Sequence, residues 1–231
     1  MNITSIKTSL FKQDDRLEAF VIKNLPKLQE GDIVVVTSKI VALAQGRVGK
    51  LEDKQKLIKC ESRRVIKTPW AFLTLTDDGW CINAGIDESN AGHQLILMPH
   101  EPFVAAQQLR RALKKHFKLQ RLGVLITDTK SVPLRVGTIG RAVGFAGYKP
   151  LKSYVGKRDI FGRTSRDTVS NCADALAAAA VLMMGEGAEQ TPLAVISEAP
   201  VQFIETVNPN SKKLAFDPQQ DIFKYVYRSQ K

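Results

Sequence analysis

Apolar residues along the chain fall into short runs and helical repeats that predict a mixture of strands and helices. Residues 31–47 open with a buried strand and continue as a helical or extended segment up to a glycine. Apolar positions in residues 101–118 recur at three- and four-residue spacing, which predicts an amphipathic helix. Short apolar runs predict three further strands, within residues 93–99, 121–128 and 192–197.

Two segments carry turn and capping signals in addition. Residues 71–85 place apolar residues on either side of an Asp-Asp-Gly turn, the pattern of a β-hairpin. Residues 165–187 combine the N-cap candidates Ser165 and Asp167 with a long Ala-rich body that ends in glycine, which predicts a tightly packed helix. Hairpins mixed with helical crossovers predict an α+β fold with mixed sheets. Without a clear linker, we expect a single domain over residues 1–231, within which two subdomains could be interleaved.

Composition places the chain among ordinary globular proteins. Its 231 residues, 44% hydrophobic and 25% charged, suffice to bury a substantial core. Its apolar runs are shorter than the roughly 18 to 20 residues that a membrane span requires, and the first ten residues do not resemble a signal peptide. We therefore expect a cytoplasmic protein without a membrane partner.

Cysteine and histidine patterns limit the possible metal chemistry. Cys60, Cys81 and Cys172 are widely spaced and odd in number, so they predict buried free thiols and neither a disulfide framework nor a CxxC metal site. The three histidines lack HxH or HxxxH spacing. Any metal is therefore expected to be bound through oxygen.

The net charge of +11 predicts an anionic partner, which could be nucleic acid, a membrane surface, or a small phosphorylated or carboxylated ligand. Basic residues cluster in Lys54–Lys67, Arg110–Arg121 and Lys149–Arg166. The first two clusters are interpreted as solvated helix faces. The third contains Gly, Pro and aromatic residues, as a nucleic-acid groove or a phosphate-binding loop would.

Asp87 and Asp128 are the first candidates for site chemistry. Each follows an apolar, strand-like run, in NAGIDESN and TDTKSVPLR respectively, and each has hydroxyl neighbours. Loops after strands expose functional groups on a rigid support, and carboxylate and hydroxyl oxygens suit Mg²⁺ or Mn²⁺. The residues alone leave open that both aspartates merely cap turns.

A glycine-dense segment lies between the second aspartate and the long helix. Residues 135–163 contain six glycines, which predicts close approach of the backbone to a ligand or to another chain. The chain contains neither GxGxxG there nor GxxxxGK[ST] anywhere, so neither a Rossmann nor a P-loop site is predicted.

Taken in order, the segments GDIVVVTSKIVALAQGR, NAGIDESN, TDTKSVPLRVGTIGRAVGFAG, YVGKRDIFGR and ADALAAAAVLMMGEG resemble the coenzyme F420-0:γ-glutamyl ligase family. We expect a divergent, bacterial member. The resemblance implies an enzyme that uses GTP and a divalent metal to join L-glutamate to a deazaflavin lactyl-phosphate precursor through an acyl phosphate. It also implies a mixed α+β fold that forms an intertwined homodimer.

The resemblance also implies site residues. The metal ligands would be Asp87, Asp128, Thr129 and Glu186, with Mg²⁺ or Mn²⁺ as the ion. The GTP contacts would be Thr8, Ser9, Leu10, Phe11, Ser38, Lys39, Asn90, Met184, Gly185, Gly187, Ala188, Glu189, Gln190 and Thr191. On chemical grounds, four cations are predicted as catalytic residues that hold phosphate or carboxylate: Arg135, Lys157, Arg158 and Arg163.

Departures from the family pattern concern the pocket rim. Leu43 replaces a lysine that usually contacts GTP, and Lys130–Leu134 replaces a segment that usually begins with Gly-Arg. The acceptor could therefore be the deazaflavin precursor or a folate. A basic nucleic-acid-binding module and an inactive scaffold are the alternatives of another class. Nucleic acid is the less favoured partner because it would leave Asp87, Asp128 and Glu186 without a role.

Overall fold

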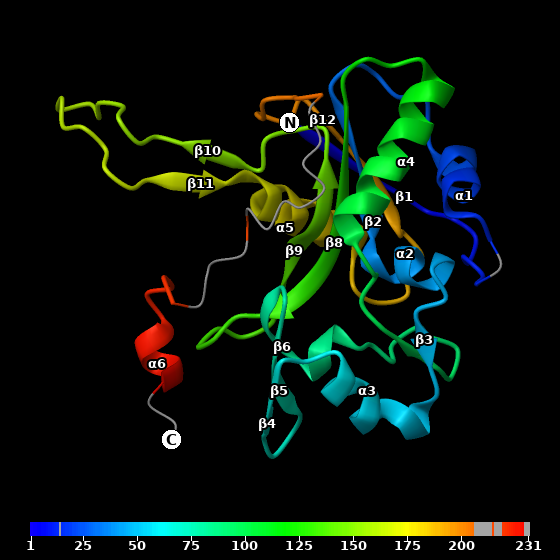
Figure 1. Cartoon of the computed structure of the whole chain (residues 1–231). Coiled ribbons are helices and arrows are strands. Elements are labelled where there is room, and N and C mark those ends of the chain that lie inside the picture. The colour runs from blue at the N-terminus through cyan, green and yellow to red at the C-terminus, as the bar shows by residue number, and fades with distance from the viewer. Residues whose placement is uncertain (14, 206–213, 215–218, 229–231) are drawn as a thin grey trace.

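The structure, a computed structural model, describes residues 1–13, 15–205, 214 and 219–228 (Figure 1). A five-stranded sheet lies at its centre, in the order β1-β12-β2-β8-β9. β2 and β8 run parallel, and the other neighbouring strands run antiparallel. The strands are β1 (Asn2–Ile6), β2 (Asp32–Thr37), β8 (Leu122–Ser131), β9 (Thr138–Ala146) and β12 (Leu193–Ser197).

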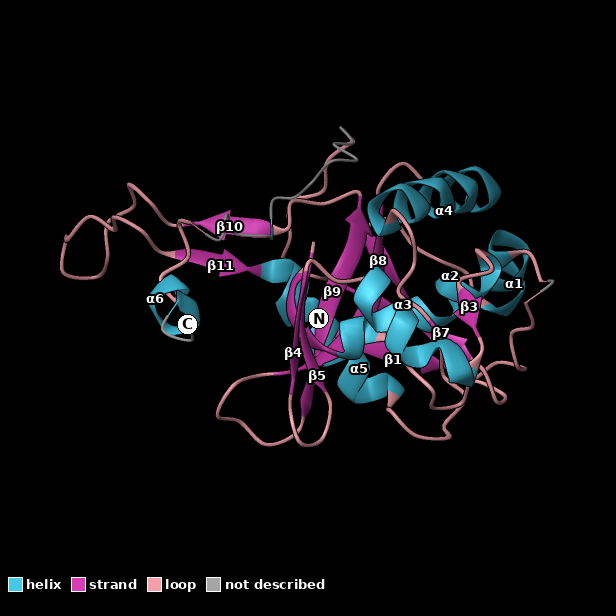
Figure 2. Cartoon of the chain, turned by 60° about the horizontal axis from the view of Figure 1, so that its bottom comes forward, coloured by secondary structure: helices cyan, strands magenta, loops and turns pink. Residues whose placement is uncertain are grey.

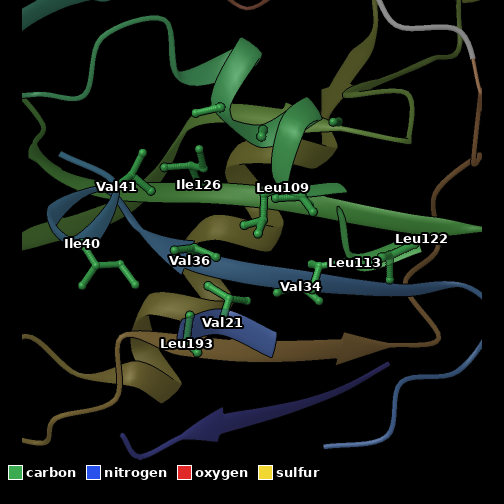
Figure 3. Close-up of a cluster of buried hydrophobic side chains, with 14 of the residues drawn as sticks. Val21, Val34, Val36, Ile40, Val41, Leu109, Leu113, Leu122, Ile126 and Leu193 are labelled. Atoms are coloured by element: carbon green, nitrogen blue, oxygen red, sulfur yellow. The ribbon is translucent and has the colours of Figure 1, made fainter. Parts of the chain in front are cut away.

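Helices cover both faces of this sheet. Because successive side chains of a strand point to opposite faces, alternate residues of β2 enter different cores. Val34 and Val36 pack with α1 (Leu17–Asn24) and α4 (Pro102–Phe117), as Figure 3 shows. Ile33 and Val35 belong to the cluster that includes α5 (Cys172–Met184). Because both faces of β2 are buried, its sequence is a nearly continuous apolar run.

A smaller group of elements lies below the central sheet in Figure 1. Its buried residues form a separate cluster that includes Ile58, Ile86 and Leu95. β3 pairs with β7, and β4, β5 and β6 form an antiparallel sheet. The elements between β2 and α4 are α2 (Ser38–Ala44), β3 (Val48–Gly49), η1 (Leu51–Asp53), α3 (Lys54–Cys60), β4 (Arg64–Lys67), β5 (Phe72–Thr76), β6 (Gly79–Ile82), η2 (Asn83–Gly85) and β7 (Leu95–Ile96).

A two-stranded arm extends away from the body of the protein (Figures 1 and 2). It consists of β10 (Leu151–Ser153) and β11 (Val169–Asn171), joined by a long exposed loop. The last element is α6 (Lys224–Arg228). None of the helices formed by the described residues has the length and apolarity that crossing a bilayer requires.

The α+β class with mixed sheets is confirmed, and most predicted elements are present. The segment after β2 is helical rather than extended, since it forms α2. The predicted hairpin corresponds to β5 and β6, and the predicted amphipathic helix corresponds to α4. The strand predicted at 121–128 continues to Ser131, whereas the one predicted within 93–99 is limited to Leu95–Ile96.

The helix predicted over residues 165–187 begins later than expected. Its N-cap is Asn171, whose Oδ1 accepts a hydrogen bond from the Asp174 N–H at 3.0 Å. Ser165 and Asp167, the predicted N-caps, lie in the arm loop. The physical reason is that β11 pairs with β10, which keeps residues 169–171 extended until the chain reaches α5.

Two predictions about burial were wrong. Arg110, interpreted as part of a solvated helix face, is only 2% exposed, and its Nε donates to the Leu122 carbonyl at 2.6 Å. The cysteines are free thiols, as predicted, but none is buried: Cys60 is exposed, and Cys81 and Cys172 are partly exposed.

Close backbone approach occurs at three of the six glycines of the glycine-dense segment, and there it occurs within the chain itself, whereas a Cβ at any of the other three would meet nothing within 4 Å. A Cβ added at Gly140 would lie 2.6 Å from the Ala177 carbonyl oxygen of α5, and one at Gly144 would lie 2.5 Å from the Pro102 carbonyl oxygen of α4. Side chains at these two positions would therefore separate β9 from the helices on either face of the sheet.

Candidate functional site

The candidate site lies at one edge of the central sheet because of the direction of its strands. β2 and β8 are parallel, so their carboxyl ends meet at the same edge. Ser38 starts α2 directly after β2, and Asp128 lies near the end of β8. β12 runs antiparallel to β2, so the loop that precedes it, residues 185–192, arrives at the same edge.

A cavity of about 300 Å³ opens at this edge. Its lining comes from six separate stretches of the chain, which lie within residues 8–11, 37–43, 85–90, 96–98, 127–129 and 181–192. All four residues predicted as metal ligands and all fourteen predicted as GTP contacts line it. The structure thus brings all eighteen residues together, and their individual roles remain predictions.

Asp87 is an acid of the cavity whose carboxylate is paired with a cation. Its Oδ2 lies 2.8 Å from Lys39 Nζ, and the Ser89 backbone N–H donates to its Oδ1 at 2.7 Å. Burial alone would raise the pKa of Asp87, but the hydrogen bonds from Lys39 and Ser89 outweigh it and keep the pKa below the ordinary value.

Asp128 and Glu186 carry pKa values above the ordinary range. Burial raises the pKa of Asp128, although Arg141 and a 3.1 Å hydrogen bond from Ser38 Oγ oppose the shift. Burial also raises the pKa of Glu186, which accepts a 3.3 Å hydrogen bond from Thr129 Oγ1. The negative charge of Asp128 adds to that shift. A cation in this cavity would stabilise the ionised form of both acids.

The oxygen donors of the cavity fit a divalent ion that is only partly bound by protein. Among the described residues, no three His, Cys, Asp or Glu side chains lie together as a ready metal cluster. Mg²⁺ commonly takes only one or two carboxylates and completes its shell with water and substrate phosphates. A set of protein ligands for such an ion is present in the lining of one cavity: the carboxylates of Asp87, Asp128 and Glu186 and the Thr129 hydroxyl.

The loop of residues 185–191 is held in place by contacts with two other segments that line the cavity. Asn90 Nδ2 donates to the Gly187 carbonyl at 2.9 Å, and the Thr8 N–H donates to the Gln190 carbonyl at 3.0 Å. Within the loop, the Gly187 N–H donates to Glu189 Oε2 at 2.8 Å. Two segments distant in sequence therefore hold the loop, which carries several of the predicted nucleotide contacts.

The four predicted catalytic cations lie outside this cavity. Arg135 is exposed in the turn between β8 and β9. Lys157, Arg158 and Arg163 are exposed on the loop of the arm, which extends away from the body of the chain (Figure 2). One chain alone does not bring these side chains to the carboxylates.

The sequence indicated Ser89 only as a hydroxyl neighbour of Asp87 and indicated no role for Arg141. Ser89 donates to Asp87 through its backbone and its hydroxyl, an Asx-turn that the Asp-Glu-Ser spacing could have indicated. Arg141 reaches Asp128 and also pairs with Asp78. No local signal reveals the two contacts of Arg141, because they depend on the register of β8 and β9 and on the packing of the distant β5–β6 hairpin.

Comparison with known proteins gives concordant matches. The family model described as F420-0:Gamma-glutamyl ligase matches residues 5–57 and 53–198. The chain is similar to proteins named Coenzyme F420:L-glutamate ligase, with 33% identity to that of Methanosarcina mazei over 82% of each chain and 35% identity to that of Methanosarcina barkeri over 81% of each. That of Archaeoglobus fulgidus is 32% identical over 81% of this chain and 83% of its own. These relatives are archaeal and lend no support to the expected bacterial origin.

Proposed function

The chain belongs to the F420-0:gamma-glutamyl ligase family, and on that premise we propose that it is a metal-dependent ligase that uses GTP to join L-glutamate to a carboxylate acceptor. The observation that carries this proposal is the single cavity lined by all eighteen residues predicted to bind metal and nucleotide. The names of the relatives favour a deazaflavin coenzyme as the acceptor.

Each part of the cavity has a distinct task in this proposal. Asp87, Asp128 and Glu186, with the Thr129 hydroxyl, would hold Mg²⁺ or Mn²⁺. When bound, such an ion neutralises charge that develops on the phosphates during transfer. Lys39 adds a positive charge to the cavity wall. The 185–191 loop would hold the nucleotide against the ends of β2 and β8.

The reaction proceeds in two displacements. An oxygen of the acceptor carboxylate attacks the γ-phosphorus of GTP, which forms an acyl phosphate and releases GDP. The neutral amine of L-glutamate then attacks the acyl carbon, loses a proton and displaces inorganic phosphate. The contribution of the protein is to position the reactants and stabilise their charge, so no covalent protein intermediate is required.

The arm is the basis for the homodimer within this proposal. Ile160 and Phe161 on its loop are 91% and 89% exposed, beside the cations Lys157, Arg158 and Arg163. Burial of such large apolar side chains against a partner surface is more favourable than their exposure to solvent. We infer that the arm docks on a second copy of the chain, where its cations could approach the substrates of the partner.

Sedimentation velocity tests the homodimer. We expect the wild-type chain to sediment as a dimer and the variant Ile160→Asp/Phe161→Asp as a monomer, because charges at these positions would have to be buried without partners. Trp70→Asp, at an equally exposed position in the β4–β5 turn, is the control and should leave the dimer intact. A monomeric wild type, or a dimeric arm variant, would contradict the inference.

A product screen by mass spectrometry tests the proposed function and identifies the acceptor. The protein is incubated with GTP or ATP, Mg²⁺ or Mn²⁺, L-glutamate, and either a deazaflavin or a folate acceptor. We expect the deazaflavin to gain the mass of a glutamyl unit only when GTP and metal are both present. A folate product would reassign the acceptor. No product together with no GTP binding would favour an inactive scaffold, and salt-dependent binding of random oligonucleotides would favour a nucleic-acid module.

A further inference from the structure

Arg141 is a buried cation that contacts the candidate metal site from behind. It lies on β9 directly opposite Asp128 in the register of β8 and β9, and it is 6% exposed. Its Nη2 is 3.8 Å from Asp128 Oδ2. Its Nη1 pairs with the carboxylate of Asp78 and donates to the Asp78 carbonyl oxygen at 3.4 Å. Arg141 is not among the residues that line the cavity.

The Asp128 carboxylate is therefore held at both of its oxygens. Ser38 Oγ donates to Oδ1 from the start of α2, and the Arg141 guanidinium faces Oδ2 from β9. One contact comes from the residue that directly follows β2 and the other from β9, and these two strands flank β8 in the sheet. The two contacts restrict the side-chain rotamer, which is the usual way in which a second layer of residues orients a ligand.

Asp78 fixes the other side of the guanidinium. It belongs to the turn between β5 and β6, outside the central sheet and outside the cavity. Burial of a cation is costly unless charged partners compensate it. Asp78 supplies such a partner through the Arg141 Nη1 atom. Arg141 Nε, by contrast, has no hydrogen-bond acceptor in the described part of the chain. Arg141 thus links the turn of the three-stranded sheet to Asp128.

We propose that Arg141 is a positioning residue for Asp128 and that Asp78 holds the Arg141 guanidinium in place from outside the cavity. The pair would keep the Asp128 carboxylate oriented for a divalent cation. This inference rests on the proposed function, because it takes Asp128 as a metal ligand.

Binding of Mn²⁺ alone tests the proposal without turnover. The electron paramagnetic resonance signal of free Mn²⁺ gives its Kd for each variant. Arg141→Gln is expected to weaken Mn²⁺ binding by about 10-fold or more, the range found when residues that orient metal ligands are removed. Arg141→Lys is expected to recover only part of the loss, because an ammonium cannot face both carboxylates with a planar fork.

The β5–β6 turn offers a matched pair of variants. Asp78→Asn is expected to weaken Mn²⁺ binding by a smaller factor than Arg141→Gln. Asp77→Asn should leave the Kd unchanged, because the Asp77 side chain is 81% exposed and pairs with Arg63 instead. The double variant Arg141→Gln/Asp78→Asn should bind Mn²⁺ no more weakly than Arg141→Gln alone. Both changes interrupt the same series of contacts, from Asp78 through Arg141 to Asp128.

Two further measurements distinguish the ways in which the proposal could fail. They are the thermal unfolding of the variants and the binding of Mn²⁺ by Asp128→Asn. If Arg141→Gln and Asp78→Asn lower the Tm but bind Mn²⁺ like the wild type, Arg141 has a structural role only and the proposal is overturned. If Arg141→Gln does not fold, the comparison of Asp78→Asn with Asp77→Asn decides: equal Kd values overturn the proposal. If Asp128→Asn itself binds Mn²⁺ normally, it is the proposed metal site that fails.

Discussion

Replacement of Asp128 by asparagine is expected to abolish metal-dependent nucleotide binding while the fold is retained. Asparagine keeps the shape of the side chain and can still accept the hydrogen bond from Ser38, but it removes the charge that a divalent ion requires. Because loss of a residue that merely orients a ligand costs about 10- to 100-fold in metal affinity, loss of the ligand itself should exceed that range.

Calorimetric titration of GTP in the presence of Mn²⁺ measures the effect of Asp128→Asn. The variant should show no heat of binding under conditions where the wild type saturates, and its far-UV circular dichroism should match the wild type. Asp77→Asn, which removes an exposed carboxylate without touching the cavity, is the control. Unchanged GTP affinity in Asp128→Asn would refute the site assignment.

Replacement of Arg110 by alanine is expected to destabilise the protein by about 2 kcal/mol, because it leaves the buried Leu122 carbonyl without its donor and removes the packing of the side-chain stem. For a chain of this size, this corresponds to a decrease in Tm of roughly 4 to 8 °C. The loss of the ion pair with Glu205 adds little, because the Glu205 side chain is 66% exposed.

The neighbouring residue provides the control for Arg110. Arg111 lies on the same helix but is exposed, so Arg111→Ala should change the stability little. Urea denaturation of the two variants measures the difference in the free energy of unfolding. Equal stability of Arg110→Ala and Arg111→Ala would show that the buried guanidinium contributes nothing beyond its exposed neighbour.

Local patterns explain which parts of the fold could be predicted. The spacing of apolar residues in α4 and the apolar run of β2 are properties of single segments, and both elements are present. The burial of Arg110 depends on the start of β8 and on Glu205, far along the chain. The start of α5 was misplaced because the pairing of β11 with β10 cannot be recognised from three residues of each strand.

The same distinction, between properties of a single segment and contacts between distant segments, holds for the site. Asp87 and Asp128 were found from their position after strand-like runs with hydroxyl neighbours. Glu186 was implied only by the family resemblance, since an acid after a helix normally passes as an exposed polar residue. Arg141 was missed because its contact with Asp128 follows from the register of β8 and β9, which includes an irregularity between Ile126 and Thr127.

The central claim is that this cavity couples GTP to amide-bond formation through an acyl phosphate. The most direct test uses an acceptor labelled with ¹⁸O in its carboxylate, incubated with GTP, Mn²⁺, L-glutamate and the protein. Because the carboxylate oxygen that attacks phosphorus leaves with it, the account predicts one ¹⁸O atom in the released phosphate for each glutamyl unit added. Formation of the amide product together with unlabelled phosphate would contradict it.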